Sequence, residues 1–213
     1  MDNIARCMRL YLITDDAGRM PADLAERVER GIAGGATAVQ FREKNGGPSM
    51  CARAFERIAR ICENADVPLF LNADLAGRFE PNGKFAGYHY SDRTLPLHPD
   101  SLPTISGYSA HAPADAVSAF AHGAHFCTLS PIFPTPSKIG ILDAIGVAAI
   151  AETRQRLPHK TIVALGGVNH ENAADCMAAG ADGLGVIRAV MAAADPEAAA
   201  KKLRAIIENY ANS

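Results

Sequence analysis

The sequence predicts a single (β/α)8 barrel of the TIM-barrel class, an α/β fold that spans residues 1–213 as one domain. Short apolar runs alternate with helical stretches eight times, which is typical of a parallel sheet built from βα units. Several of these runs are almost wholly apolar, as expected for strands that are covered on both faces. A length of 213 residues suits one such barrel.

The alternation places each element in turn. Within the first long helix, Leu24, Val28 and Ile32 recur at helical spacing. We expect strands at 9–14, 38–42, 67–72, 87–91, 104–109, 126–130, 161–165 and 183–187. We expect helices at 21–34, 48–65, 112–121, 143–157, 170–179 and 196–210.

One local pattern recurs between helices and strands. A helix ends in Gly followed by Ala, just before the next strand, at 34–36, 123–124 and 180–181. Gly tolerates the left-handed conformation that ends many helices, so the recurrence favours successive copies of one βα unit. An open doubly wound sheet is the alternative. No GxGxxG follows the first strand, however, and eight is the number of strands that closes a barrel.

The composition limits the kinds of binding partner that we expect. The formal net charge of −2 gives no basic field for nucleic acid or for an anionic membrane. No apolar run is long enough to span a bilayer or to act as a secretory signal, so we expect a cytoplasmic protein. The five cysteines form no CxxC pair, which favours buried free thiols over a zinc or redox site. The sequence leaves open whether the chain forms a homo-oligomer.

Candidate site residues lie where the strands end, because the working groups of such barrels gather at the C-terminal strand ends. Gln40, Arg42 and Lys44 alternate along the second strand and therefore share one face. Polar side chains inside a barrel need a partner, and an anionic ligand would supply one. Interior ion pairs, for example with Asp15 or Glu43, are the structural alternative.

The last two strands end in a pattern that is typical of phosphate sites. Gly166 and Gly167 close the seventh strand, and Ile187 and Arg188 follow the eighth. Barrel phosphate sites are commonly built from these two loops, where glycines let backbone N–H groups approach the ligand. A plain tight turn is the alternative for the glycine pair.

Two further features sit on the same end of the predicted barrel. The 130–138 loop carries three prolines, and Thr135, Ser137 and Lys138 in it can contact phosphate oxygens. Such a loop is often a lid, or else a surface loop stiffened for stability. His89 and His111 stand at strand ends and are candidate proton carriers or hydrogen-bonded structural residues.

Short motifs follow one another through almost the whole chain. They are LYLITD at 10–15, QFREK at 40–44, LN at 71–72, GYH at 87–89, GYSAH at 107–111, PIFPTPSK at 131–138, ALGGV at 164–168 and AGADG at 179–183. Their order and spacing resemble the thiamine phosphate synthase and TenI superfamily.

The resemblance implies an enzyme of thiamine biosynthesis. Synthases of this family join hydroxymethylpyrimidine pyrophosphate to a thiazole phosphate: pyrophosphate leaves, and the thiazole nitrogen captures the pyrimidine cation. The resemblance implies that the pyrimidine and the pyrophosphate are held by Gln40, Arg42, Lys44, Asn72, Ser109 and Lys138. It implies thiazole phosphate contacts for Thr135, Ser137, Gly167, Ile187 and the position of Arg188.

Three positions depart from the synthase pattern. The magnesium-binding aspartate after Asn72 is replaced by Ala73, and the second magnesium aspartate by Thr94. Arg188 stands where the family has a serine. Magnesium held on a pyrophosphate needs carboxylate ligands, so we expect weakened Mg²⁺ binding, with Asp92 as the candidate substitute ligand.

The resemblance also leaves other functions open. TenI-type members share the barrel, and the characterised type is a thiazole phosphate tautomerase that uses a histidine at the position of Pro131. An isomerase of this kind would use His89 or His111 in its place. A barrel that binds a phosphorylated ligand without catalysis is the third possibility. The missing carboxylates favour the isomerase and the binding protein, whereas the retained Gln40–Arg42–Lys44 set and the 131–138 loop favour the synthase.

Overall fold

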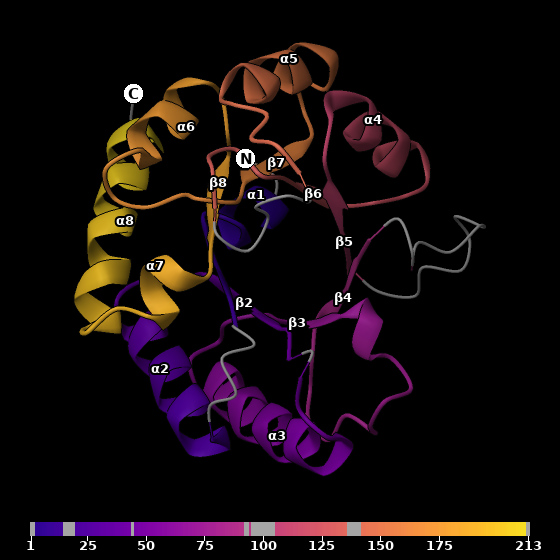
Figure 1. The fold of residues 1–213 in the computed structure, drawn as a ribbon, viewed down its shortest axis with the longest axis vertical. Coiled ribbons are helices and arrows are strands. Elements are labelled where there is room, and N and C mark those ends of the chain that lie inside the picture. Colours follow the sequence, from indigo (N-terminus) through magenta and orange to yellow (C-terminus); the bar gives the residue numbers. More distant parts are fainter. Residues whose placement is uncertain are drawn as a thin grey trace.

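The computed structural model describes residues 3–14, 20–43, 45–91, 94, 105–135 and 142–211. Within them, eight parallel strands pair in sequence order and close into a barrel, so the predicted fold class is confirmed (Figure 1). The strands are β1 (Leu10–Ile13), β2 (Ala38–Phe41), β3 (Leu69–Asn72), β4 (Gly87–Tyr90), β5 (Ile105–Ala110), β6 (Phe126–Leu129), β7 (Thr161–Ala164) and β8 (Gly183–Val186).

Helices surround the barrel (Figure 1). The six predicted ones are α2 (Pro21–Ala33), α3 (Pro48–Asn64), α4 (Pro113–Ala121), α5 (Ala148–Arg156), α6 (Ala173–Ala178) and α8 (Pro196–Ala211). Proline opens α2, α3, α4 and α8, where its missing N–H costs no helical hydrogen bond. Three short elements were not predicted: α1 (Asn3–Cys7), the 3-10 turn η1 (Ala73–Leu75) and α7 (Arg188–Met191). They are too short to show helical periodicity.

Two predicted helix starts were wrong. Helix α5 begins at Ala148 rather than at 143. The N–H groups of Ile145 and Gly146 are instead donated to the carbonyls of Pro131 and Ile132, and Gly146 has φ of 71°. Helix α6 begins three residues later than predicted, at Ala173, because side chains hold 169–172 in a turn.

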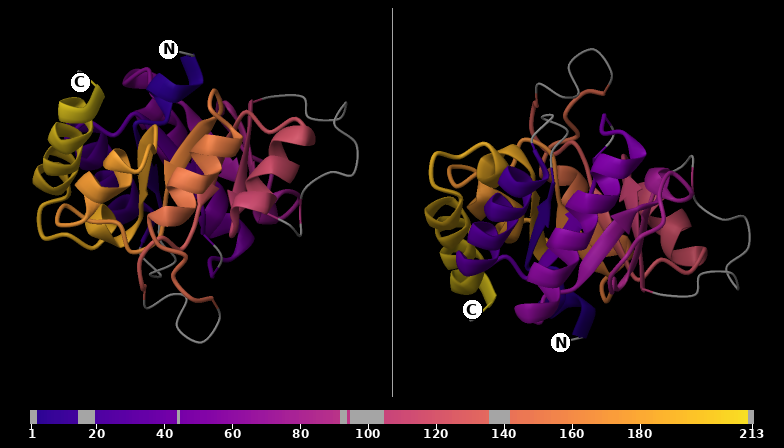
Figure 2. Two further views of the ribbon diagram at one scale, coloured as in Figure 1. Left: turned by 90° about the horizontal axis from the view of Figure 1, so that it is seen from above. Right: turned by 90° about the horizontal axis from the view of Figure 1, so that it is seen from below.

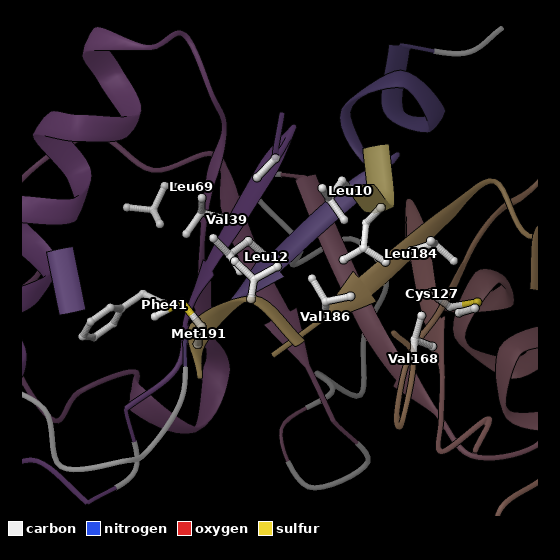
Figure 3. Close-up of a cluster of buried hydrophobic side chains, with 14 of the residues drawn as sticks. Leu10, Leu12, Val39, Phe41, Leu69, Cys127, Val168, Leu184, Val186 and Met191 are labelled. Carbon is white, nitrogen blue, oxygen red and sulfur yellow. The ribbon is translucent and has the colours of Figure 1, made fainter. Parts of the chain in front are cut away.

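The apolar residues form two layers separated by the sheet. Alternate strand residues such as Leu10 and Leu12 face the helices and join the larger cluster, part of which is shown in Figure 3. Tyr11 and Ile13 face the barrel interior together with Met8, Ala38, Phe70, Phe126 and Val163. The buried polar residues Gln40 and His89 lie inside the same barrel.

The Gly–Ala pattern of the sequence corresponds to a repeated turn. Gly35, Gly123 and Gly180 have φ of 105°, 88° and 99°, which is the left-handed region. The following alanine N–H is donated each time to the carbonyl five residues earlier, at 3.0, 3.0 and 3.2 Å. A fourth copy follows α3, with Asp66 at φ of 52° in the glycine position. The same helix ending therefore serves four βα units.

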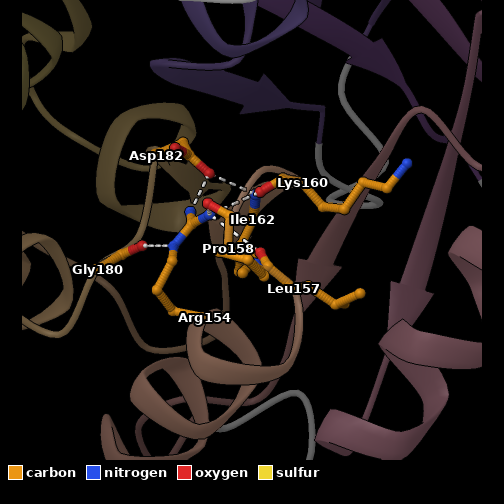
Figure 4. Close-up of polar contacts among 7 residues, drawn as sticks. All are labelled: Arg154, Leu157, Pro158, Lys160, Ile162, Gly180 and Asp182. Atoms are coloured by element: carbon orange, nitrogen blue, oxygen red, sulfur yellow. Dashed lines mark hydrogen bonds and ion pairs between the residues drawn. The ribbon is translucent and has the colours of Figure 1, made fainter.

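The N-terminal end of the barrel is closed by protein groups. Figure 2 shows α1 at one end of the barrel and the described flanks of the β6–α5 connection at the other. Arg154 of α5 donates to the carbonyls of Leu157, Pro158, Lys160 and Gly180 and pairs with Asp182 (Figure 4). Among the described helices, none is long and apolar enough to cross a membrane.

Candidate active site

A chain of polar side chains crosses the upper interior of the barrel. The Asn72 amide nitrogen donates to Gln40 Oε1 at 3.3 Å, and Gln40 Nε2 donates to the Tyr11 hydroxyl at 2.9 Å. That hydroxyl lies 3.2 Å from His89 Nδ1, and His89 Nε2 lies 2.9 Å from Ser109 Oγ. Five strands, β3, β2, β1, β4 and β5, each contribute one member.

Sequence reasoning identified four of these five residues and missed Tyr11. Its ring belongs to the inner layer, where Phe70 and Phe126 contact it edge-on. The alternation along β1 could have placed Tyr11 inward, since it is two residues before Ile13. Nothing in the sequence indicates that its hydroxyl reaches both Gln40 and His89.

His89 is fully enclosed and electrically neutral. It is 2% exposed, and burial, helped by the positive charge of Arg42, lowers its pKa to about 3. Burial likewise raises the pKa of the Tyr11 phenol well above its usual range. These values fit the interpretation of His89 as a hydrogen-bonded structural residue, and they argue against proton transfer by His89 near neutral pH.

Arg42 directly follows β2, and its backbone is held at that point by one side chain. The Thr14 hydroxyl accepts a hydrogen bond from the Arg42 N–H at 2.8 Å and donates one to the Arg42 carbonyl at 3.0 Å. Thr14 thus extends the β1–β2 pairing by one residue, and it fixes the root of the Arg42 side chain at the barrel mouth. Lys44 lies outside the described residues.

His111, directly after β5, has one ring nitrogen that is held by a backbone carbonyl. Its Nδ1 lies 2.6 Å from the Ser130 carbonyl oxygen, and its backbone N–H is donated to Asp115 Oδ2 at 3.0 Å. A carbonyl can only accept, so Nδ1 carries a hydrogen. In a neutral imidazole, Nε2 is then the ring nitrogen that can accept a proton.

The loop after β6 is anchored at both of its ends. Ile132 and Phe133 donate their N–H groups to the carbonyls of Leu165 and Gly166, at 2.9 and 3.0 Å. Ile145 and Gly146 bind back to the same segment, as described above. Thr135 belongs to this stem, whereas Ser137, Lys138 and the proposed lid movement lie outside the described residues.

The glycine pair after β7 is required by the loop stem. Gly166 and Gly167 have φ of 89° and 69°, and a Cβ on Gly167 would stand 2.7 Å from Phe133 Cβ. Across the described residues, the N–H groups of Gly166, Gly167, Arg188 and Ala189 donate no hydrogen bond. Because β7 and β8 are neighbouring strands, the loops that carry these N–H groups are adjacent. The arrangement suits an anion, as predicted for these loops.

Comparison with known proteins identifies the family of this chain. The family model described as thiamine monophosphate synthase matches residues 10–190. The chain belongs to this family. It is 36% identical over 202 residues to the thiamine-phosphate synthase of Chloroflexus aurantiacus, covering 93% of this chain and 92% of the relative. It is 37% identical over 188 residues to that of Bacillus velezensis, covering 85% and 83%.

A solved structure agrees in fold along the whole length. The thiamine phosphate pyrophosphorylase from Pyrococcus furiosus superposes with a TM-score of 0.84 at 27% identity. The match covers 98% of this chain and 99% of that one. The family resemblance expected from the eight motifs is thereby confirmed.

The described residues do not match a magnesium site anchored by carboxylates. Ala73 offers a methyl group, and the Thr94 hydroxyl is engaged with the N–H of Ser91 at 2.9 Å. Asp74 is exposed, and its N–H is donated to the Asn72 side chain. In the described part of the chain, no cluster of three or more His, Cys, Asp or Glu residues could hold a metal ion. Asp92 lies outside that part.

Proposed function

We propose that this member of the thiamine monophosphate synthase family joins hydroxymethylpyrimidine pyrophosphate to a thiazole phosphate and releases pyrophosphate. The observation that carries the proposal is the hydrogen-bonded chain from Asn72 to Ser109, which opens at the C-terminal strand ends beside Arg42. The relatives from C. aurantiacus and B. velezensis are named for this reaction.

The reaction needs groups that stabilise a departing anion. The bond between the pyrimidine methylene carbon and the pyrophosphate oxygen breaks, and the electron pair leaves with pyrophosphate. The thiazole nitrogen then donates its lone pair to the methylene carbon, which yields thiamine phosphate. Arg42, with Lys44 and Lys138, is proposed to neutralise the leaving group, and Gln40, Asn72 and Ser109 to orient the pyrimidine.

The thiazole phosphate is proposed to bind at the two adjacent loops after β7 and β8. The undonated N–H groups of Gly166, Gly167 and Arg188 support this placement, with Thr135 and Ser137 as further donors. The Arg188 side chain is exposed and adds a positive charge beside these donors. Pyrimidine and thiazole would thus approach from different strands and meet over the barrel mouth.

The described residues lack the paired carboxylates that would anchor magnesium. The protein cations are proposed to carry most of the charge neutralisation, and Asp92 is the candidate residue for a weakened magnesium contact. We therefore expect a magnesium requirement that saturates only at high concentration.

The test is a turnover assay with the two synthase substrates, with and without Mg²⁺, beside a synthase that has both aspartates. Thiamine phosphate and pyrophosphate should form in equal amounts. Absence of product in the presence of measurable thiazole phosphate binding would contradict the synthase proposal and favour a binding protein.

A specific observation favours an isomerase as the second candidate. The His111 Nδ1–H donates to the Ser130 carbonyl, which leaves Nε2 as the ring nitrogen for general acid–base catalysis on a thiazole phosphate. This reaction would exchange substrate protons with solvent deuterium without a metal. The exchange should disappear in His111→Asn, and an unchanged exchange rate in that variant would exclude His111.

A further inference from the structure

We propose that Tyr11 is a positioning residue that gives the interior chain a single hydrogen-bond direction and leaves Ser109 as a donor toward the substrate. The kinetic consequence rests on the proposed function, whereas the direction of the hydrogen bonds can be tested without it. Tyr11 itself is 0% exposed and is enclosed at the barrel centre, so it acts through its neighbours.

The direction is set at one end by a backbone group. The N–H of Asp74 can only donate, and it is donated to Asn72 Oδ1 at 3.2 Å. The Asn72 oxygen therefore faces Asp74, and the amide nitrogen faces Gln40 Oε1. Gln40 must then direct its own Nε2 toward the Tyr11 oxygen. Both amide orientations thus follow from one fixed donor.

Tyr11 extends the same hydrogen-bond direction from Gln40 to His89. Its oxygen accepts from Gln40, so its own hydrogen is available for His89 Nδ1, 3.2 Å away. An Nδ1 that accepts puts the histidine hydrogen on Nε2, which faces Ser109 Oγ at 2.9 Å. Thr128 Oγ1, at 3.4 Å from the same nitrogen, is the more distant acceptor.

Packing keeps the two rings in this arrangement. The Tyr11 and His89 rings lie nearly parallel, with centroids 5.8 Å apart and an interplanar angle of 27°. Phe126 contacts both rings, with centroids at 5.6 Å from each. The lowered pKa of His89 agrees with this chain, because a doubly protonated ring could not accept from Tyr11.

The consequence for substrate recognition falls on Ser109. Its oxygen already accepts from His89 Nε2–H, so its own hydrogen is left for a group at the barrel mouth. The ligand atom that meets Ser109 should therefore be an acceptor, such as a ring nitrogen or a pyrophosphate oxygen, rather than an amino group. Removal of the Tyr11 hydroxyl would leave the Gln40 amide without its acceptor and His89 Nδ1 without its donor.

The direct test is ¹⁵N NMR of the wild-type chain labelled at histidine, with His89→Gln used to assign the signal. We expect Nε2 protonated and Nδ1 unprotonated with the signal position of a hydrogen-bonded acceptor. In Tyr11→Phe, the Nδ1 signal should move toward that of a nitrogen with no donor. Tyr88→Phe, the matched control, should leave it unchanged, because Tyr88 joins the outer layer. Protonation of wild-type Nδ1, or an unmoved signal in Tyr11→Phe, would overturn the proposal.

Kinetics give the second readout. In Tyr11→Phe, kcat/KM for the pyrimidine substrate should fall about tenfold, the size of one lost hydrogen bond, while KM for the thiazole phosphate stays constant. Equal losses for both substrates would indicate general structural damage and contradict a positioning role. If the wild-type chain forms no thiamine phosphate, the proposed function fails, and the NMR result still decides the direction of the chain.

Discussion

Both ends of the barrel carry a cluster of polar side chains, but the two clusters differ in whether a hydrogen-bond donor is left over. At the N-terminal end, the Arg154 guanidinium donates to four carbonyls and pairs with Asp182, whose Oδ2 also accepts the Ile162 N–H at 2.8 Å. In the interior below the C-terminal end, the Asn72–Ser109 chain finishes at a hydroxyl whose hydrogen faces the mouth. A cluster closed on itself stabilises the fold, whereas a chain with a remaining donor can bind a ligand.

The largest effect is expected from Arg42→Met. Loss of the cation that we propose to neutralise the departing pyrophosphate should lower kcat/KM by about 100- to 1,000-fold. The Thr14 hydrogen bonds to the backbone of residue 42 should survive the substitution, so the local β1–β2 pairing should be kept. Arg60→Met, at an exposed position, is the control and should keep full activity. A loss of less than threefold in Arg42→Met would remove this residue from the proposed site.

Arg154→Met should lower the stability of the fold and leave turnover unchanged. It removes the donors to Leu157, Pro158, Lys160 and Gly180 and leaves Asp182 without its cation, so the free energy of unfolding should fall by about 2–3 kcal/mol. Turnover of the variant that remains folded should match the wild type. Arg156→Met, which loses only an exposed ion pair with Glu152, should change stability by less than about 0.5 kcal/mol. Similar unfolding curves for the two variants would mean that the cluster at Arg154 is not stabilising.

The pH dependence of stability reports on His89. Its folded pKa of about 3 lies below the ordinary unfolded value, so its stabilising contribution is complete above about pH 6.5 and is lost as the pH falls toward 3. Between these limits the unfolded chain holds the extra proton. The unfolding free energy should therefore fall by about 1 kcal/mol more per pH unit in the wild type than in His89→Gln.

Denaturant unfolding between pH 6.5 and 4.5 measures this difference. His159→Gln, which changes an exposed histidine, should retain the wild-type slope. Equal slopes for the wild type and His89→Gln would show that His89 is not held neutral by the fold.

The smallest effect is expected from Ala73→Asp. It places a carboxylate at the position where the family resemblance implies a magnesium ligand, so the Mg²⁺ concentration for half-maximal turnover should fall severalfold. Ala76→Asp, an exposed position three residues later, should leave the magnesium dependence as it is. An unchanged dependence in Ala73→Asp would mean that this position does not contact the metal.

The sequence predicts the barrel well because the relevant signals are local and repeated. Apolar runs, helical spacing and the left-handed glycines recur in successive units, and Gly35, Gly123 and Gly180 take the expected conformation. The starts of α5 and α6 were wrong because distant or side-chain groups determine them. The carbonyls of Pro131 and Ile132, for example, bind the N–H groups of residues 145 and 146.

The sequence predicted which residues belong to the site better than it predicted the hydrogen bonds between them. Strand alternation placed Gln40 inward, and the family motifs pointed to Asn72, His89 and Ser109. Which inward side chains meet across the barrel depends on strand stagger and ring packing, which no local pattern contains. Tyr11 was missed for that reason, and the neutral state of His89 follows only from its burial.

The difference between the two ends is tested most directly by amide hydrogen exchange with and without a thiazole phosphate plus inorganic pyrophosphate. We expect slower exchange at 165–168 and 187–190, beside the undonated N–H groups after β7 and β8. We expect no change at 157–162 and 180–183, around Arg154. Slowing confined to the Arg154 end, or no slowing after β7 and β8 at saturating ligand, would contradict a ligand site at the C-terminal end.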